Sequence, residues 1–233
     1  MMAYTLHTLL HKFMDQYTNV YDEVNTNQNY KHPFAEIIRK SIPNELKKQL
    51  DTSIYQVKGS CGAGYWTSVP WIAILDKRIT TSAQKGVYIV YLLNKSKKEL
   101  YLTLNQGVTD FTKQSRKAKK ITSFISITGK ANKSLLDLLK NEATSIRNTL
   151  EIHNIKFDLD VDSGSPSYDA GTIYCTKYDL NTLPDDNTLY ADLAAFLKAY
   201  QVYYSEYYED SVKCKFMSYL GPEDKFISVF PIL

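Results

Sequence analysis

Long apolar runs, paired cysteines and secretion signals are missing from this sequence of 233 residues. No apolar run approaches the ~20 residues that a membrane-spanning helix needs, and the N-terminus has neither a basic start nor an apolar signal core. The three cysteines, Cys61, Cys175 and Cys214, are odd in number, far apart, and without the short paired spacing typical of zinc sites. We therefore expect a protein of the reducing cytoplasm that neither enters a membrane nor holds a metal.

Motifs for covalent or nucleotide-driven chemistry are also missing. The Ser60-Cys61-Gly62 segment has the form of a nucleophile turn, which needs a base nearby. The chain has four histidines: His7, His11, His32 and His153. No motif sets any of them beside Cys61, which we interpret as a small packed side chain. Thr128-Gly129-Lys130 lacks the upstream glycine and the full spacing of a phosphate-binding loop, and we expect no cofactor.

Three carboxylates, Asp158, Asp160 and Asp162, alternate along an expected strand and are candidate metal ligands. The later glycine and glutamate of a calcium loop are missing, and no nuclease lysine motif follows. A solvated acidic edge beside a turn is the favoured interpretation.

Hydrophobic residues make up 44% of the chain, enough for a substantial core in one large domain or in a domain with an appendage. The charge is uneven, because residues 1–150 carry 22 Lys and Arg against 11 Asp and Glu, whereas residues 151–233 carry 6 against 14. A basic half suits a polyanion such as DNA, although an uneven spread of solvated charge explains the same counts. The 19 tyrosines favour stacking and amphipathic surfaces without locating them.

Hydrophobic periodicity predicts an α+β fold with a central mixed, largely antiparallel β-sheet flanked by helices. Helices are expected at residues 4–24, 34–40, 43–50 and 134–153, and the acidic segment 183–187 introduces a long helix that runs to about residue 208. Strands are expected at 54–58, 69–75, 86–94, 100–104, 157–161 and 172–177, with a β-prone patch at 121–127. Residues 25–30 and 162–166 are predicted as turns. We expect one compact domain, in which a helical segment (1–53) packs on a core (54–210) that is followed by an extension (211–233).

The most informative stretch is a glycine-rich turn that runs into two tryptophans and then an apolar strand. It reads Gly59-Ser60-Cys61-Gly62-Ala63-Gly64-Tyr65-Trp66-Thr67-Ser68-Val69-Pro70-Trp71-Ile72-Ala73-Ile74. Glycines allow a tight turn and a close approach to another molecule, and each indole offers a broad stacking face. Such a pairing suits a pocket for a planar ligand.

Two later segments extend this pattern: Gly86-Val87-Tyr88-Ile89-Val90-Tyr91-Leu92 and Tyr101-Leu102-Thr103-Leu104-Asn105-Gln106-Gly107. Together they resemble the N-terminal DNA-binding domain of the McrB family, the specificity subunits of modified-cytosine (type IV) restriction systems. The resemblance is specific in order, spacing and aromatic positions over residues 54–108, and looser to about residue 205. In that family a modified cytosine is extruded from the duplex into an aromatic-lined pocket. The resemblance implies that Trp71, Tyr88 and Leu92 form this pocket; for Trp71, core packing is the alternative.

One position departs from the family pattern. In the family pattern a tyrosine lies between the two glycines of the turn, where it wedges into the duplex, whereas this chain has Ala63. A methyl group cannot fill the gap that an extruded base leaves, so either Tyr65 or Trp66 supplies the wedge, or flipping works differently. Ordinary cover of the sheet is an equal alternative for both aromatics. The resemblance implies a DNA-facing turn made of Lys58, Ser60, Gly62, Ala63, Gly64, Tyr65 and Trp66.

Other polar residues are weaker candidates. Asn105 and Gln106, beside a glycine, could hydrogen-bond a base edge or cap a turn, and the turn is slightly favoured. Five cations precede the 121–127 patch: Lys113, Arg116, Lys117, Lys119 and Lys120. They could neutralise DNA phosphates, which positions a duplex without reading its sequence, or form a solvated face.

The sequence thus favours a DNA-binding specificity module that recognises modified cytosine in double-stranded DNA by base flipping, for a restriction or anti-phage system. We expect it to catalyse nothing itself, with the motor and the nuclease in another chain or region. The alternative is a stand-alone metal-dependent nuclease that acts on modified DNA.

Overall fold

The computed structural model describes residues 5–27, 31–62, 64–109 and 135–209. Several predicted features lie outside the described residues: Ala63, the cations Lys113, Arg116, Lys117, Lys119 and Lys120, the patch at 121–127 and the extension at 211–233. Predictions for these positions stay predictions.

Five antiparallel strands form the centre of the fold and are paired in the order in which they follow along the chain. They are β1 (Tyr55–Ser60), β2 (Trp71–Asp76), β3 (Val87–Asn94), β4 (Glu99–Gln106) and β5 (Thr172–Asp179). The predicted α+β class with a largely antiparallel sheet is therefore confirmed, and none of the pairings between described strands is parallel.

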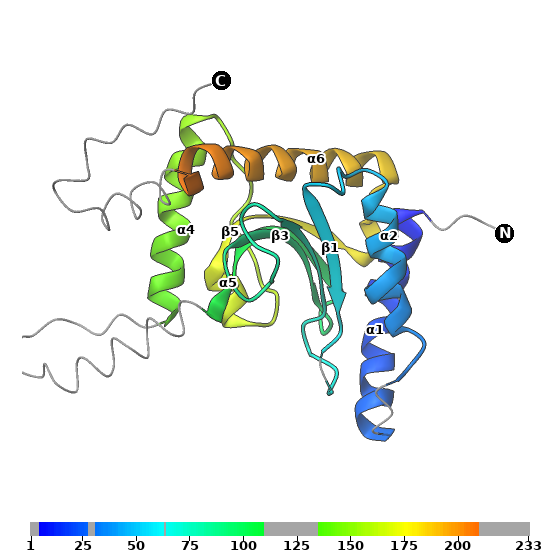
Figure 1. The fold of residues 1–233 in the computed structure, drawn as a ribbon. Coiled ribbons are helices and arrows are strands. Elements are labelled where there is room, and N and C mark those ends of the chain that lie inside the picture. Colours follow the sequence, from blue (N-terminus) through cyan, green and yellow to red (C-terminus); the bar gives the residue numbers. More distant parts are fainter. Residues whose placement is uncertain (1–4, 28–30, 63, 110–134, 210–233) are drawn as a thin grey trace, which may run out of the picture.

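Helices surround this sheet. They are α1 (Leu6–Asn27), α2 (Ile42–Lys47), α4 (Leu135–Ile152), α5 (Pro166–Gly171) and α6 (Asp186–Val202). Short π-helical turns, η1 (Ile37–Ser41) and η3 (Tyr203–Tyr208), precede α2 and follow α6, and a 3-10 turn, η2 (Leu180–Thr182), follows β5. In Figure 1, α1 and α2 lie beside β1, α4 lies on the other side of the sheet, and α6 runs between these groups. None of the described helices has the length and apolar character needed to cross a membrane.

The two faces of the sheet have different covers. Along β3, Ile89, Tyr91 and Leu93 join the large core with side chains of α1, α4 and α6. Tyr88 and Leu92 join a smaller apolar cluster on the other face, together with Val90. Alternate residues of a strand point to opposite faces, and covers on both explain why β3 is buried along its whole length. The smaller cluster holds the predicted site.

Some elements differ from the sequence-based expectations. Helix α1 continues through residues 25–27, which the sequence predicts as a turn. Residues 157–161 make one isolated bridge, Asp158 to Cys175, instead of a strand. Leu159 is exposed there, so the segment lacks the buried alternate face that stabilises a strand. Helix α5 (Pro166–Gly171) lies between the turn predicted at 162–166 and the strand predicted at 172–177, where the sequence analysis expects no helix.

Candidate nucleic-acid interface

A small pocket opens on the sheet face away from α1, α4 and α6. It has a volume of about 120 Å³ and is lined by Trp71, Ala83, Gln84, Tyr88, Val90, Leu92 and Tyr168. The three residues predicted to hold a base, Trp71, Tyr88 and Leu92, are thus brought together around one pocket. Trp71 lies directly opposite Leu92 in the register of β2 and β3, and Tyr88 shares a face of β3 with Leu92.

The residues that line the pocket differ in their exposure to solvent. Leu92 is fully buried and Tyr88 is 2% exposed, whereas Trp71 is only partly buried. Burial disfavours the phenolate, so the pKa of Tyr88 lies above its ordinary value, and the nearby Tyr168 raises this pKa further. The Tyr88 phenol is therefore neutral at physiological pH. Within the described part of the chain its hydroxyl has no hydrogen-bond partner, so it can donate to a ligand.

Four pocket residues were not selected by sequence reasoning: Ala83, Gln84, Val90 and Tyr168. Tyr168 lies on α5, and Ala83 and Gln84 lie in the loop between β2 and β3. The region of Tyr168 has no hydrophobic periodicity that marks a buried aromatic. One signal does indicate α5, since Pro166 in the first turn is typical of a helix start.

The loop between β1 and β2 extends beyond the sheet and leads directly into Trp71 (Figure 1). Its backbone is shaped by two glycines with positive φ. A Cβ on Gly62, which has a φ of 113°, would lie 2.0 Å from Tyr65 O, so only glycine fits there. Gly62 N also donates to Ser60 Oγ over 3.1 Å. A Cβ on Gly64 would meet nothing within 4 Å, so open space lies in front of this residue.

The two aromatics of this loop have opposite environments. Trp66 is 4% exposed, and its ring stacks on Tyr17 with 5.6 Å between centroids. Tyr17 also donates its hydroxyl to Thr67 O over 2.7 Å, which ties the loop to α1. The prediction of Trp66 as a DNA-facing residue is therefore corrected, because its indole belongs to the core. Tyr65 is 74% exposed and is accessible from outside.

Basic side chains border the loop and the pocket. Lys58 is exposed on β1 and donates from Nζ to Thr81 O over 2.8 Å. Lys85 is exposed in the β2–β3 loop that lines the pocket. Arg39 of η1 donates from Nη2 to Gly62 O over 3.1 Å. Sequence reasoning selected Lys58 and missed Arg39 and Lys85, because isolated cations form no pattern along the chain.

Asn105 and Gln106 connect elements of the fold. Asn105 Nδ2 donates to Tyr168 O over 3.1 Å and to Thr172 Oγ1 over 2.9 Å. Gln106 Nε2 donates to Gly171 O over 3.2 Å and to a carbonyl of α4 over 3.1 Å. Both side chains are buried, so contact with a base edge is excluded, and their role is to fasten α4 and α5 to β4.

The candidate catalytic residues Cys61 and Asp162 lie in environments that indicate structural roles. Cys61 is fully buried, and burial raises the pKa of its thiol, which disfavours the nucleophilic thiolate. Asp162 pairs with Lys97 over 2.7 Å, and this lysine holds the pKa of the carboxyl below its usual range. Among the residues that the structure describes, no three His, Cys, Asp or Glu side chains converge on a possible metal site. Nothing in this part of the chain supports the nuclease alternative.

The family model described as MrcB-like, N-terminal domain, matches residues 16–205. The matched range contains every strand of the sheet, the loop between β1 and β2, and α5. It therefore includes all residues that line the pocket. A comparison with curated proteins gave no match.

Proposed function

The chain belongs to the family of MrcB-like N-terminal domains, and from this premise we propose that its pocket holds a modified cytosine extruded from double-stranded DNA. The N-terminal domain of McrB is a DNA-binding specificity module, so the family supports DNA as the ligand class. The observation that carries the proposal is the grouping of Trp71, Tyr88 and Tyr168 with Leu92 around one small pocket beside an exposed glycine loop.

The size of the pocket supports a single base as its occupant. Its volume of about 120 Å³ is well below the roughly 300–1,000 Å³ of pockets for drug-sized ligands. Extrusion of a base costs a few kcal/mol, and each base–aromatic stack returns about 1–3 kcal/mol. Stacking on Trp71 and a second ring thus offsets the cost, while Leu92 and Val90 offer apolar contact to a substituent.

The exposed Tyr65 supports a route to extrusion despite Ala63. Tyr65 is exposed on the loop that enters β2 at Trp71. A Tyr65 phenol inserted into the duplex would therefore lie on the same continuous segment as the pocket residue Trp71. Arg39 beside that loop, and Lys58 and Lys85 beside the β2–β3 loop that lines the pocket, supply positive charge for phosphates of the duplex. Tyr65 is therefore our candidate for the wedge that fills the vacated position in the stack.

In this proposal the module supplies specificity to a restriction or anti-phage assembly and performs no bond cleavage. The Thr128-Gly129-Lys130 segment does not have the spacing of a nucleotide-binding loop, which agrees with a motor located elsewhere. The motor and the nuclease then reside in another chain or another region.

Two measurements on the purified chain test the proposal. Affinities are compared for otherwise identical duplexes that carry cytosine, 5-methylcytosine or 5-hydroxymethylcytosine at one position. A fluorescent base analogue at the same position is expected to brighten on binding, because extrusion removes its quenching neighbours. Tyr65→Ala is expected to reduce this signal more than it reduces affinity for unmodified duplex. Tight binding without any brightening would require groove readout in place of base flipping.

A further inference from the structure

Tyr168 is the pocket residue contributed by α5, a helix too short to be stable without contacts to the rest of the fold. Helix α5 has only six residues, Pro166–Gly171, and its N-cap residue Ser165 makes no side-chain capping bond. Isolated helices shorter than about 12–15 residues are marginal in water. The direction of the Tyr168 ring therefore depends on how α5 is fastened to the sheet.

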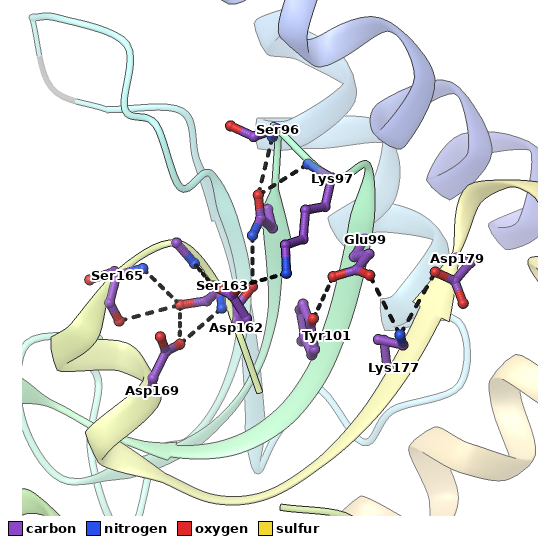
Figure 2. Close-up of polar contacts among 12 residues, drawn as sticks. Ser96, Lys97, Glu99, Tyr101, Asp162, Ser163, Ser165, Asp169, Lys177 and Asp179 are labelled. Atoms are coloured by element: carbon purple, nitrogen blue, oxygen red, sulfur yellow. Dashed lines mark hydrogen bonds and ion pairs between the residues drawn. The ribbon is translucent and has the colours of Figure 1, made fainter. Parts of the chain in front are cut away.

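On the N-terminal side, α5 is fastened by one carboxylate. Asp169 Oδ1 accepts from Ser163 N over 2.9 Å and from Ser163 Oγ over 2.6 Å. Ser163 is fully buried, and its Oγ also accepts from Ser165 N over 3.3 Å. Figure 2 shows these residues around the start of α5. We call Ser163 and Asp169 the clasp, because their bonds fold the chain that enters α5 back onto the residue that follows Tyr168.

The clasp is itself held to the hairpin between β3 and β4. Asn94 Nδ2 donates to Asp162 O over 2.8 Å, and Asp162 Oδ2 pairs with Lys97 Nζ over 2.7 Å (Figure 2). Asn94 is buried and is the last residue of β3, the strand that supplies Tyr88 and Leu92 to the pocket. Asn94 therefore connects the clasp to the strand that carries two of the pocket residues.

On the C-terminal side, α5 has little freedom to shift. Thr172 Oγ1 and Asn105 Nδ2 both donate to Tyr168 O, over 2.9 Å and 3.1 Å. A Cβ on Gly171 would lie 2.8 Å from Asn105 Oδ1, so the helix end lies directly against β4. Tyr168 is therefore fixed from both ends of a helix only six residues long.

We propose that the clasp of Ser163 and Asp169 is a positioning unit that sets the affinity for the extruded base through Tyr168. This inference rests on the proposed function of the pocket and extends it to two side chains that do not line the pocket. Without the clasp, the first turn of α5 loses its fastening while the C-terminal bonds to Tyr168 O remain. The ring then samples orientations that do not match the occupant.

The test compares variants of the full chain with duplexes that carry the best-bound base or unmodified cytosine. Asp169→Ala is expected to weaken binding to the former by about 5-fold to 100-fold, the range for loss of one base–aromatic stack, and to leave the latter within about 2-fold. Asp169→Asn keeps an acceptor oxygen and is expected to retain more affinity. Asp179→Ala is the matched control, because this carboxylate on β5 pairs with Lys177 (Figure 2) and, among the described residues, makes no hydrogen bond or ion pair with α5.

A double-mutant cycle separates positioning from general destabilisation. In the Tyr168→Ala background, Asp169→Ala is expected to change affinity by less than about 2-fold, because the residue that it positions is already gone. Equal losses in both backgrounds would overturn the inference, as would a normal Asp169→Ala variant beside an impaired Tyr168→Ala. If Asp169→Ala does not fold, Asp169→Asn and Ser163→Ala replace it in the cycle. If Trp71→Ala and Tyr168→Ala both keep the preference for the best-bound base, the proposed function of the pocket is refuted instead.

Discussion

The two tryptophans of the chain illustrate how neighbouring residues acquire different roles. Trp66 packs in the large core against Tyr17, whereas Trp71 begins β2 on the opposite face and borders the pocket. Truncation of a buried aromatic leaves a cavity and costs about 3–5 kcal/mol of stability. Truncation of a partly exposed pocket residue acts mainly on the ligand. The two substitutions therefore have separable consequences.

We predict that Trp71→Ala and Tyr88→Ala each weaken binding to the modified duplex by about 1–3 kcal/mol, the range for loss of a stacking partner. Trp66→Ala should instead lower the free energy of unfolding by about 3–5 kcal/mol. Titration of labelled duplex measures the first effect, and urea denaturation measures the second. Unchanged affinity in well-folded Trp71→Ala and Tyr88→Ala variants would remove the pocket assignment.

Thiol chemistry gives a second prediction at the scale of single residues. Burial raises the pKa of Cys61, and burial together with Asp158 and Asp160 raises the pKa of Cys175 to about 12. Both thiols are therefore protonated at pH 8, and alkylation of the folded chain should be at least about tenfold slower than in urea. Peptide mapping after timed alkylation gives the rate at each cysteine. Rapid modification of Cys61 in the native state would reopen its interpretation as a nucleophile.

At the scale of elements, periodic patterns along the chain were sufficient to predict much of the fold. Leu139, Ala143 and Ile146 recur at helical spacing and are buried on α4, which matches the helix predicted at 134–153. The burial of Trp66 and the position of Tyr168 could not be predicted in this way. Both depend on contacts between segments distant in sequence, such as the stack of Trp66 on Tyr17 and the bond from Asn105 to Tyr168 O. Local periodicity does not encode such contacts.

The close approach of β1 to η1 gives a prediction for two glycines. A Cβ on Gly59 would lie 1.8 Å from the backbone oxygen of Ile38, which cannot move without shifting η1. Gly64 has open space but a φ of 88°, which disfavours a side chain. We expect Gly59→Ala to lower the free energy of unfolding by more than about 3 kcal/mol and Gly64→Ala by about 1 kcal/mol. Equal urea midpoints for the two variants would contradict the packing described for η1.

At the scale of the whole molecule, the uneven charge follows the arrangement of the proposed interface. Residues 1–150 carry the excess of Lys and Arg, and they supply β1 to β4 and the loop before Trp71. The acidic remainder supplies α6, which packs on the face away from the pocket. The basic part also supplies six of the seven residues that line the pocket, and the acidic part supplies Tyr168. A duplex that approaches the pocket thus meets mainly the basic part of the sequence, and phosphate contacts there set orientation without reading bases.

This distribution leads to a prediction for the basic segment before residue 121. Reversal of charge at Lys117, Lys119 and Lys120 should weaken modified and unmodified duplex almost equally, because phosphates are the same in both. Each lost phosphate contact changes the slope of log affinity against log salt by about 0.9, so three contacts flatten it by about 3. Affinities measured from low to high salt give this slope.

The control must change net charge by the same amount at sites away from the pocket. Lys47, Lys48 and Lys198 are exposed on α2, directly after α2 and on α6, and these two helices pack in the large core on the face away from the pocket. Reversal of these three should alter affinity through the overall charge alone and leave most of the slope intact, because counterions are released only where lysines meet phosphates. If both triple variants flatten the slope equally, the segment before residue 121 has no special contact with DNA. If only the first does, the duplex lies across that segment while the base is read in the pocket.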